Sequence, residues 1–125
     1  MPNVEVKVNG TQIKKFVLAM RDRFCDANLP GVYGLPRGGL VLAVMISHAL
    51  NIPLLMAPVE GCLIVDDICD SGESLLHYIK DSSNSKQKKY NIATVYCKKD
   101  AMVKPDFYLY TKRDNTWIIF PWEVI

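Results

Sequence analysis

A run of apolar residues leads directly into a cluster of acidic residues between positions 62 and 75. The run Cys-Leu-Ile-Val (62–65) is followed by Asp-Asp-Ile-Cys-Asp-Ser-Gly-Glu-Ser-Leu (66–75). Continuous hydrophobicity is typical of a strand that is buried on both faces of a parallel sheet. Three aspartates within five positions repel one another and are costly without a cation or hydroxyl partners. The segment therefore predicts an α/β fold with a ligand site where this strand ends.

The residues after this strand combine donors for a phosphate group with acceptors for a diol. Ser71 and Ser74 lie at a predicted helix start, where free backbone N–H groups and the helix dipole attract an anion. Asp66 and Asp67 cannot bind that anion directly, but they suit sugar hydroxyls or a hydrated Mg²⁺. Ordinary helix capping would account for Ser71 and could include Asp70, but it would not account for the other two aspartates. The pattern indicates a site for a ribose 5-phosphate.

Strand-like and helix-like patterns alternate along the rest of the chain. Strands are predicted over 4–8, 32–35, 52–55, 62–65, 91–97, 107–110 and 117–120. Helices are predicted from a cap at Thr11 to Phe24, over 40–50, which is apolar nearly all round and should be well buried, and over 71–81. This alternation predicts an α/β fold in which helices flank a mostly parallel, twisted sheet. A chain of 125 residues is expected to form a single domain, 1–125.

Composition and charge exclude several classes of protein. Half of the residues are apolar and 22% are charged, which excludes a disordered chain. A net charge of +2 gives no reason to expect nucleic acid or an anionic membrane as a partner, and the basic segment 81–89 is interpreted as a solvated loop. No apolar run is long enough to span a bilayer. The four cysteines form no CxxC pair, so we expect reduced thiols in a cytoplasmic protein.

Residues 66–74 resemble the phosphoribosyl pyrophosphate (PRPP) binding motif of the type I phosphoribosyltransferases. That motif follows an apolar strand and consists of two acidic residues, two spacers and Asp-Thr/Ser-Gly-x-Thr/Ser. The resemblance implies that Asp70 is the acid/base residue, and that Asp66 and Asp67 hold the ribose hydroxyls and the waters of a Mg²⁺ ion. The residues of this segment that it assigns to PRPP are Asp66, Asp67, Asp70, Ser71, Gly72, Glu73 and Ser74.

A second segment, Gly-Leu-Pro-Arg-Gly-Gly-Leu (34–40), is similar to the pyrophosphate loop of the same family. Gly38 and Gly39 would let the backbone approach an anion closely, and Arg37 would add a charge suited to phosphate. The resemblance assigns Arg37 to both catalysis and PRPP binding, and it implies a cis peptide bond between Pro36 and Arg37. Without the acidic segment, these glycines would indicate only a turn between a strand and a helix.

The C-terminal segment Trp-Ile-Ile-Phe-Pro-Trp-Glu (117–123) is similar to the end of the xanthine-guanine and hypoxanthine branch of the family. The resemblance implies a small base-binding segment in which Trp117 stacks on the purine and the backbone carbonyl of Ile118 reads its edge. It also places Lys98 on the purine 6-oxo group, where an ammonium donor would reject the amino group of adenine. The alternative for Trp117 and Trp122 is a hydrophobic strand, buried in a core or a dimer interface.

The resemblance implies transfer of a 5-phosphoribosyl group from PRPP to guanine, hypoxanthine or xanthine, with release of pyrophosphate. The partners would be PRPP and a purine base, the cofactor Mg²⁺ and the assembly a homodimer. Such a reaction passes through an oxocarbenium-like transition state, so the protein mainly positions groups and neutralises charge.

One feature departs from the family pattern. Members carry a long mobile loop before the acidic strand, whereas only residues 56–61 lie there in this chain. Six residues reach about 20 Å, which is needed to return along the sheet, so no closing lid is expected. The chain would then have weak activity, or a partner chain would supply the lid. The alternative function is a non-catalytic PRPP- or nucleotide-binding protein that has lost its lid.

Overall fold

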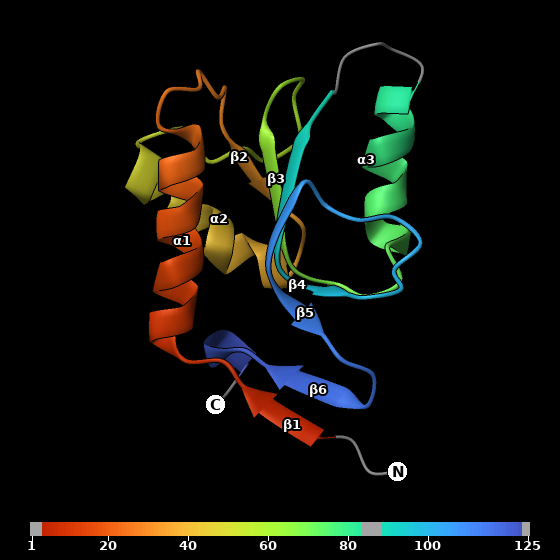
Figure 1. Cartoon of the computed structure of the whole chain (residues 1–125). Helices are drawn as coiled ribbons and strands as arrows, with labels where there is room; N and C mark the ends of the chain where they lie inside the picture. Colours follow the sequence, from red (N-terminus) through yellow and green to blue (C-terminus); the bar gives the residue numbers. More distant parts are fainter. Residues whose placement is uncertain (1–3, 84–88, 124–125) are drawn as a thin grey trace.

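A computed structural model describes residues 4–83 and 89–123 of the chain. Its elements in chain order are β1 (Val4–Lys7), α1 (Gly10–Phe24), β2 (Val32–Gly34), α2 (Gly38–Leu50), β3 (Leu63–Cys69), α3 (Glu73–Ser83), β4 (Asn91–Lys98), β5 (Phe107–Lys112), β6 (Thr116–Ile119) and the 3-10 helix η1 (Pro121–Glu123). Four parallel strands form the central sheet in the order β2-β3-β4-β5, and β1 pairs with β6 in a separate parallel sheet below it (Figure 1). None of the described helices has the length and apolar character needed to cross a membrane.

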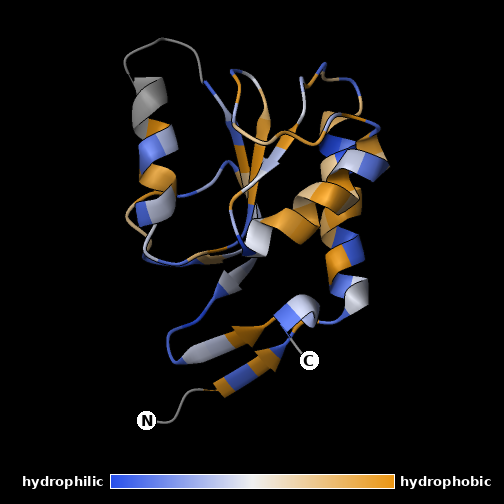
Figure 2. Ribbon diagram, turned by 180° about the vertical axis from the view of Figure 1, so that it is seen from behind, coloured by the Kyte–Doolittle hydropathy of each residue, from blue (hydrophilic) through white to orange (hydrophobic). Residues whose placement is uncertain are grey.

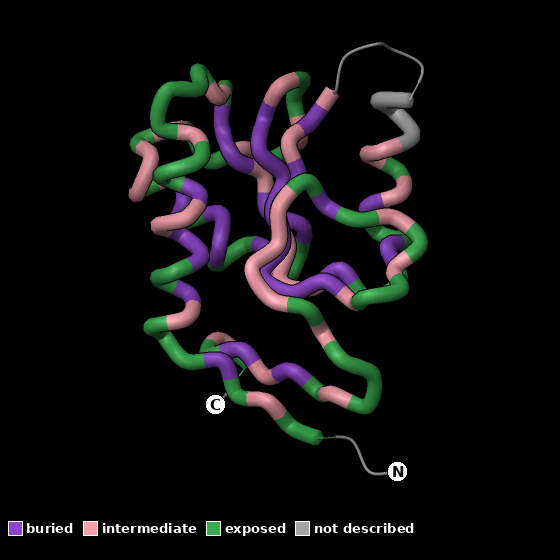
Figure 3. Tube along the Cα trace, in the orientation of Figure 1, coloured by how far each residue is buried: buried purple, intermediate pink, exposed green. Residues whose placement is uncertain are grey.

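Helices cover both faces of the central sheet. Helices α1 and α2 pack against each other on one face, and α3 lies on the other (Figure 1). Two separate clusters of buried apolar side chains fill these interfaces, one around Phe16 and Leu42 and one around Ile64 and Leu75. The strands between them are the most deeply buried part of the fold (Figure 3). The predicted α/β class with a parallel sheet and flanking helices is confirmed.

Helix α1 begins with a capping box formed by Asn9. The Asn9 side chain accepts the backbone N–H of Gln12, and the Gln12 side chain accepts that of Asn9. The predicted cap at Thr11 is wrong, because Thr11 already lies inside the helix. The helix buries one apolar stripe, formed by Ile13, Phe16, Val17 and Met20.

Helix α2 is less enclosed than its composition predicts. Figure 2 shows it mainly in hydrophobic colours, and Leu42, Ala43 and Ile46 are buried against the sheet. Its opposite face is open, however, and exposes Leu40, Val41, Val44 and Met45. The expectation of a well-buried helix is therefore wrong for one face, because only α1 and the sheet cover α2 within the described chain.

Three element boundaries differ from the predictions in ways that matter for the site. Strand β3 continues through both neighbouring aspartates to Cys69 instead of ending at Val65, since it keeps its pairing with β4 as far as Cys97. Helix α3 begins at Glu73 rather than Ser71 and runs to Ser83, and residues 84–88 of the predicted loop lie outside the described residues. The predicted strand 52–55 is reduced to one bridge between Leu54 and Val32.

Residues 51–62 connect α2 to β3, and the structure describes all of them. They stay at the edge where the strands begin, since Leu54 bridges to Val32 and Leu63 pairs with the same residue. They form no helix or strand of their own. Met56 at their tip is 90% exposed and so covers nothing on this chain. The prediction that residues 56–61 return along the sheet is therefore wrong, because α2 has already brought the chain back to the edge where the strands begin.

Candidate functional site

The predicted site residues gather at the carboxyl edge of the central sheet. Because the strands are parallel, the residues that end β3, β4 and β5 meet at one edge. The register pairs Cys69 with Cys97 and Lys98 with Lys112. Asp70, which follows Cys69, therefore lies at the same level as both lysines.

The turn between β3 and α3 forms a hollow of about 80 Å³ lined by residues 68–75. This is the phosphate-sized hollow, and residues 70–74 are the phosphate turn. The Ser71 hydroxyl accepts the backbone N–H of Glu73 at 3.2 Å, so it caps the helix start. Gly72 has a φ of +89°, and a Cβ there would lie 2.7 Å from the Val103 side chain. Only glycine satisfies both constraints. Ser74 and Glu73 are both exposed. The Glu73 carboxylate interacts favourably with the dipole at the helix N-terminus, and its charge can point into solvent.

The loop that precedes α2 lies directly beside Asp67. The predicted cis peptide bond between Pro36 and Arg37 is present. Arg37 is exposed, and a Cβ on Gly38 would overlap the Asp67 carboxylate. The N–H of Gly39 donates to the Leu35 carbonyl at 2.8 Å, so in this structure it is not free for an anion.

Arg37, Gly38 and Asp67 border a second hollow, of about 780 Å³, which Trp122 and Glu123 close on the other side. Trp122 is half-buried and stacks on Phe120 with ring centroids 4.9 Å apart. That contact favours the core interpretation of Trp122. The hollow has room for a group as large as pyrophosphate beside a cation, with Arg37 supplying a charge suited to phosphate.

Asp66 and Asp67 are neighbouring, half-buried carboxylates. Each accepts the backbone N–H of the next residue at 2.8 Å. Burial, followed by the charge of Asp67, raises the pKa of Asp66 to about 8. A cation beside the pair would relieve this repulsion.

The described residues hold no cluster of three or more His, Cys, Asp or Glu side chains that could bind a metal ion by itself. Mg²⁺ is commonly held by one or two carboxylates together with waters and substrate phosphates. The pair Asp66 and Asp67 therefore fits a Mg²⁺ ion that arrives with a phosphorylated substrate, rather than a resident metal.

Neutralising Asp66 is expected to stabilise the ligand-free protein at alkaline pH. A raised carboxyl pKa means that the folded state holds the proton more tightly than the unfolded state, whose pKa is about 3.9. The proton on Asp66 makes its full contribution to the free energy of unfolding below about pH 4, and this contribution is lost as the pH rises towards 8. Asp66→Asn should therefore gain on the order of 1–2 kcal/mol at pH 8, allowing for partial solvent screening.

Urea unfolding at pH 5 and pH 8, in the presence of a chelator, measures this effect. Asp26→Asn, in the exposed turn after α1, is the control for the loss of one negative charge. An Asp66→Asn protein that loses as much stability between the two pH values as the wild type would contradict the assignment.

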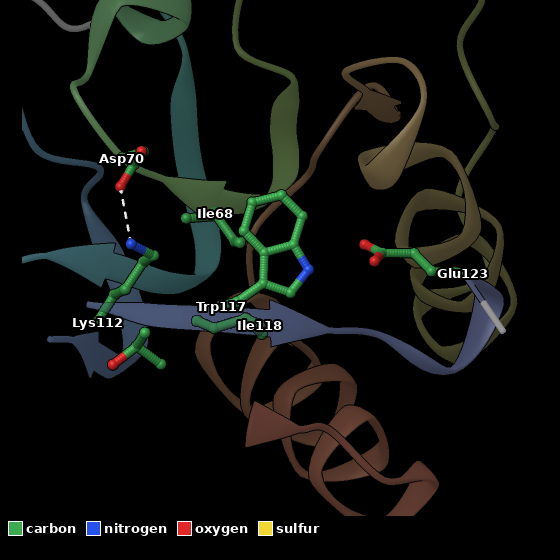
Figure 4. A pocket seen from close by; sticks show the side chains of 7 residues that line it. Ile68, Asp70, Lys112, Trp117, Ile118 and Glu123 are labelled. Atoms are coloured by element: carbon green, nitrogen blue, oxygen red, sulfur yellow. Dashed lines mark ion pairs between the residues drawn. The ribbon is translucent and has the colours of Figure 1, made fainter. Parts of the chain in front are cut away.

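A third hollow, of about 240 Å³, opens between the two sheets (Figure 4). The Trp117 ring stands beside Ile68, the Asp70–Lys112 pair lies at one end, and Glu123 lies at the other (Figure 4). Trp117 is 60% exposed, which argues against the core interpretation for this residue. An aromatic face opposite an aliphatic side chain can hold a flat ring by stacking, and Asp70 lines both this pocket and the phosphate-sized hollow.

The backbone of β6 presents a carbonyl to this pocket. The carbonyls of Asn115 and Ile119 accept N–H groups of Val4 and Val8 at 2.7 and 2.8 Å. Carbonyls alternate in direction along a strand, so that of Ile118 points away from β1. The Ile118 side chain itself is buried, and the residue lines the pocket. This arrangement is compatible with the predicted role of its carbonyl as an acceptor.

The structure separates Lys98 from the other predicted base-site residues. Its ammonium lies 3.6 Å from carboxylate oxygens of both Asp100 and Asp114. The charges of Asp100 and then Asp114 raise the pKa of Lys98. Lys98 is not among the residues that line the pocket, whereas Lys112 is.

Four residues that line the pocket were not predicted as site residues: Ile68, Lys112, Thr116 and Glu123, of which Lys112 and Glu123 are charged. Lys112 ends β5 and lies beside Lys98 in the sheet register, so its position at a strand end was the available signal. Glu123 lies in the predicted C-terminal segment and borders both the 240 Å³ hollow beside Trp117 and the 780 Å³ hollow beside Arg37. No local pattern marked it, because its position depends on the turn into η1.

Comparison with known proteins gives a consistent group of relatives, although no protein-family model matches the chain. A xanthine-guanine phosphoribosyltransferase from Cereibacter sphaeroides is 30% identical over a gapped alignment of 119 positions, and the alignment covers 74% of this chain and 68% of the relative. One from Idiomarina loihiensis is 29% identical and covers 75% and 71% of the two chains.

Solved structures agree with these relatives. A purine phosphoribosyltransferase from Pyrococcus horikoshii superposes with a TM-score of 0.77 and 27% identity, over 97% of this chain and 95% of that one. The xanthine-guanine-hypoxanthine phosphoribosyltransferase of Helicobacter pylori gives a TM-score of 0.74 over 96% and 94% of the chains. At 22% identity, the latter supports the fold alone.

Proposed function

Because the chain belongs to the purine branch of the type I phosphoribosyltransferases, a family of glycosyltransferases, we propose that it transfers a 5-phosphoribosyl group from PRPP to a 6-oxopurine base. The position of Asp70 is the observation that carries this proposal. Its carboxylate lies where a phosphate-sized hollow meets a pocket with an aromatic wall. A group at that junction can contact both a bound sugar phosphate and a base.

The residues of the two hollows can be assigned to the parts of PRPP. The turn 70–74, with Gly72, Ser71 and Ser74, would hold the 5-phosphate through backbone N–H and hydroxyl groups. Glu73 of that turn would direct its charge into solvent. Arg37 and Gly38 would line the pyrophosphate position, with Gly39 acting by packing α2 close to β3.

Asp66 and Asp67 would hold the ribose hydroxyls and the waters of a Mg²⁺ ion, which when bound supplies positive charge to the pyrophosphate. In the transfer, the bond from C1′ to the pyrophosphate oxygen breaks and its electron pair leaves with pyrophosphate. The purine N9 forms the new bond to C1′, and the proton on N7 passes to the Asp70 carboxylate. A charge-separated transition state of this kind is stabilised by groups that are already in place.

Pyrophosphate release tests the proposal directly. The purified chain is mixed with PRPP, Mg²⁺ and one base at a time, and pyrophosphate is measured. Guanine, hypoxanthine or xanthine should each be tried, with adenine as the base that the site is expected to reject. Release faster than with PRPP alone is expected with at least one 6-oxopurine, whereas adenine should not raise the rate above that of PRPP alone. A rate that no base raises above that of PRPP alone, at any enzyme concentration, would contradict the proposed activity.

The short connection between α2 and β3 sets an expectation for the rate. A closing loop excludes water from a reactive centre, and residues 51–62 supply none. We therefore expect slow turnover and some hydrolysis of PRPP without a base. Binding of PRPP without any turnover would instead favour a non-catalytic PRPP- or nucleotide-binding protein.

The exposed face of α2 supports a homodimer. Leu40, Val41, Val44 and Met45 form a contiguous apolar stripe beside the loop that carries Arg37. Such stripes on soluble proteins commonly mark an interface. A sedimentation measurement should give the mass of two chains, and a monomer at all concentrations would rule this out.

We also propose a cytoplasmic location, on the chemistry of the thiols. Cys69 and Cys97 lie opposite each other on adjacent strands, and both are free. Burial, and then the neighbouring Cys97, raises the pKa of Cys69 to about 12, which keeps this thiol protonated. Neighbouring free thiols are typical of reducing compartments.

A further inference from the structure

We infer that the β4–β5 loop, residues 99–106, holds the phosphate turn in its binding shape, and that Val103 is the positioning residue of this loop. The inference rests on the proposed function, because it names what fixes the 5-phosphate site from outside the turn. It adds no group that touches the substrate. Its basis is a series of contacts between the loop and three residues of the run 69–72.

The β4–β5 loop lies directly against the phosphate turn. The N–H of Met102 donates to the carbonyl of Ser71 at 2.9 Å. The Cys69 thiol, just before the turn, donates to the carbonyl of Val103 at 3.4 Å. Figure 1 shows the loop reaching from the end of β4 to the start of α3. Two consecutive residues of the loop therefore contact both the start and the middle of the turn.

Val103 occupies the space that a side chain at position 72 would need. A Cβ on Gly72 would lie 2.7 Å from both Cγ2 and the carbonyl oxygen of Val103, and 2.9 Å from its nitrogen. Because position 72 has no side chain, Val103 packs directly on the backbone of the turn. Glycine populates many backbone conformations, and Gly72 adopts one with a φ of +89°. The contact with Val103 limits the turn to this conformation.

Both ends of the β4–β5 loop are fixed to the sheet. At its start, the N–H of Ala101 donates to the carbonyl of Lys98 at 3.1 Å. At its end, the N–H of Asp106 donates to the carbonyl of Ile92, and the N–H of Ile92 donates to the Asp106 carboxylate, both at 2.8 Å. Val103 also packs against the buried apolar cluster beneath α3. A loop held in this way can support the turn, as a binding site needs from the residues around it.

Phosphate binding requires a change in the turn, and the loop restricts that change to a side chain. In the free protein, the Ser71 hydroxyl accepts the N–H of Glu73 at 3.2 Å. A phosphate would use both groups as donors, so the hydroxyl must rotate away from this N–H when the anion binds. The bond from Met102 keeps the Ser71 backbone in place during the rotation. A turn that already has its binding shape loses less conformational entropy, and it therefore binds more tightly.

Two ligands that occupy opposite ends of the site test this inference. Ribose 5-phosphate is expected at the phosphate turn, and inorganic pyrophosphate with Mg²⁺ in the hollow beside Arg37. Both are titrated by calorimetry into the wild-type chain, Val103→Ala, Val103→Ile and Val59→Ala. Val59 lies in the connection between α2 and β3 and is 43% exposed, so Val59→Ala is the control for the same loss of side-chain carbon atoms.

Val103→Ala should weaken ribose 5-phosphate binding by about 5-fold or more and leave pyrophosphate binding within about twofold, since small displacements of positioning groups have large effects on the ligand that they hold. Val103→Ile keeps a branched side chain on the turn and should bind both ligands as wild type does, as should Val59→Ala. Unchanged ribose 5-phosphate binding in Val103→Ala would overturn the inference. An equal loss for both ligands would also overturn it, because a general loss of stability affects both ends of the site alike.

Amide hydrogen exchange in the wild-type chain tests the same contact without a substitution. If the loop and the turn open together, ribose 5-phosphate at about ten times its Kd should slow exchange of the Met102 amide by about 10-fold. Pyrophosphate should leave this exchange rate unchanged. A Met102 amide whose exchange does not respond to ribose 5-phosphate would contradict the support of the turn by the loop.

The remaining outcomes separate this inference from the proposed function. If wild type binds ribose 5-phosphate and transfers the phosphoribosyl group, but Val103→Ala binds the sugar phosphate equally well, the proposed function stands and the role of Val103 is wrong. If wild type does not bind ribose 5-phosphate at all, the proposed function and the inference both fail.

Discussion

Replacing Asp70 by asparagine is expected to lower the turnover number by about 10²- to 10⁴-fold, the range for loss of a general acid or base. Asparagine has nearly the same shape and can still accept a hydrogen bond, but it cannot take a proton from N7. The carboxylate lies at the junction of the phosphate hollow and the base pocket, 64% exposed and paired with Lys112, so its replacement should leave the fold intact. Initial rates of pyrophosphate release at saturating PRPP and guanine measure the change.

Two controls make the Asp70 result specific. Asp26→Asn removes an equivalent charge far from the site and should leave the rate unchanged. Ribose 5-phosphate binding to Asp70→Asn should stay within a few-fold of wild type, because other residues of the turn hold the phosphate. A variant that turns over at the wild-type rate would exclude Asp70 from proton transfer.

The largest loss of stability is expected from Gly39→Ala. Gly39 is buried where α2 meets the sheet, and a Cβ there would overlap the backbone carbonyl of Val65 on β3. A Cβ on Gly34 would in turn overlap the carbonyl of Gly39, so the two glycines allow β2, α2 and β3 to approach closely. Backbone atoms cannot move aside without shifting α2, and such overpacking typically costs about 1–3 kcal/mol or more.

Urea unfolding measures this loss, and Gly10→Ala is the matched control. Gly10 opens α1 with nothing within 4 Å of the position of a Cβ, so alanine should be neutral or slightly stabilising there. Gly39→Ala should also weaken PRPP binding, because shifting α2 moves Arg37 and Gly38. A Gly39→Ala protein as stable as wild type would show that the close approach of α2 and β3 is not required.

Most of the elements could be predicted because their signals are local. The apolar runs that form β3 and β4 are buried as expected, and Phe16 and Met20 of the predicted helix α1 are buried as well. The predicted boundaries of elements were wrong where two neighbouring residues could each end or begin the element. Asn9 and Thr11 can both cap a helix, and the reciprocal bond with Gln12 decides for Asn9. Likewise, β3 continues through two charged residues because pairing with β4 satisfies its backbone.

The phosphate turn could be predicted from the sequence because everything it needs is contiguous. A strand end, a glycine in a left-handed conformation and a helix start lie within the run 69–74, so chain connectivity alone brings them together. Trp117, which lines the hollow between the two sheets, also belongs to a C-terminal segment that the sequence marks.

The choice between Lys98 and Lys112 required the tertiary structure. Both lysines end a strand of the sheet and share one level of it, so no pattern along the chain distinguishes them. Asp100 and Asp114 draw one ammonium outward, while Asp70 holds the other over the pocket. Those carboxylates reach the lysines from three different turns. Local sequence therefore determined the turn between β3 and α3 and its hollow, whereas the pairing of charges from distant segments decided which ammonium lines the pocket beside Trp117.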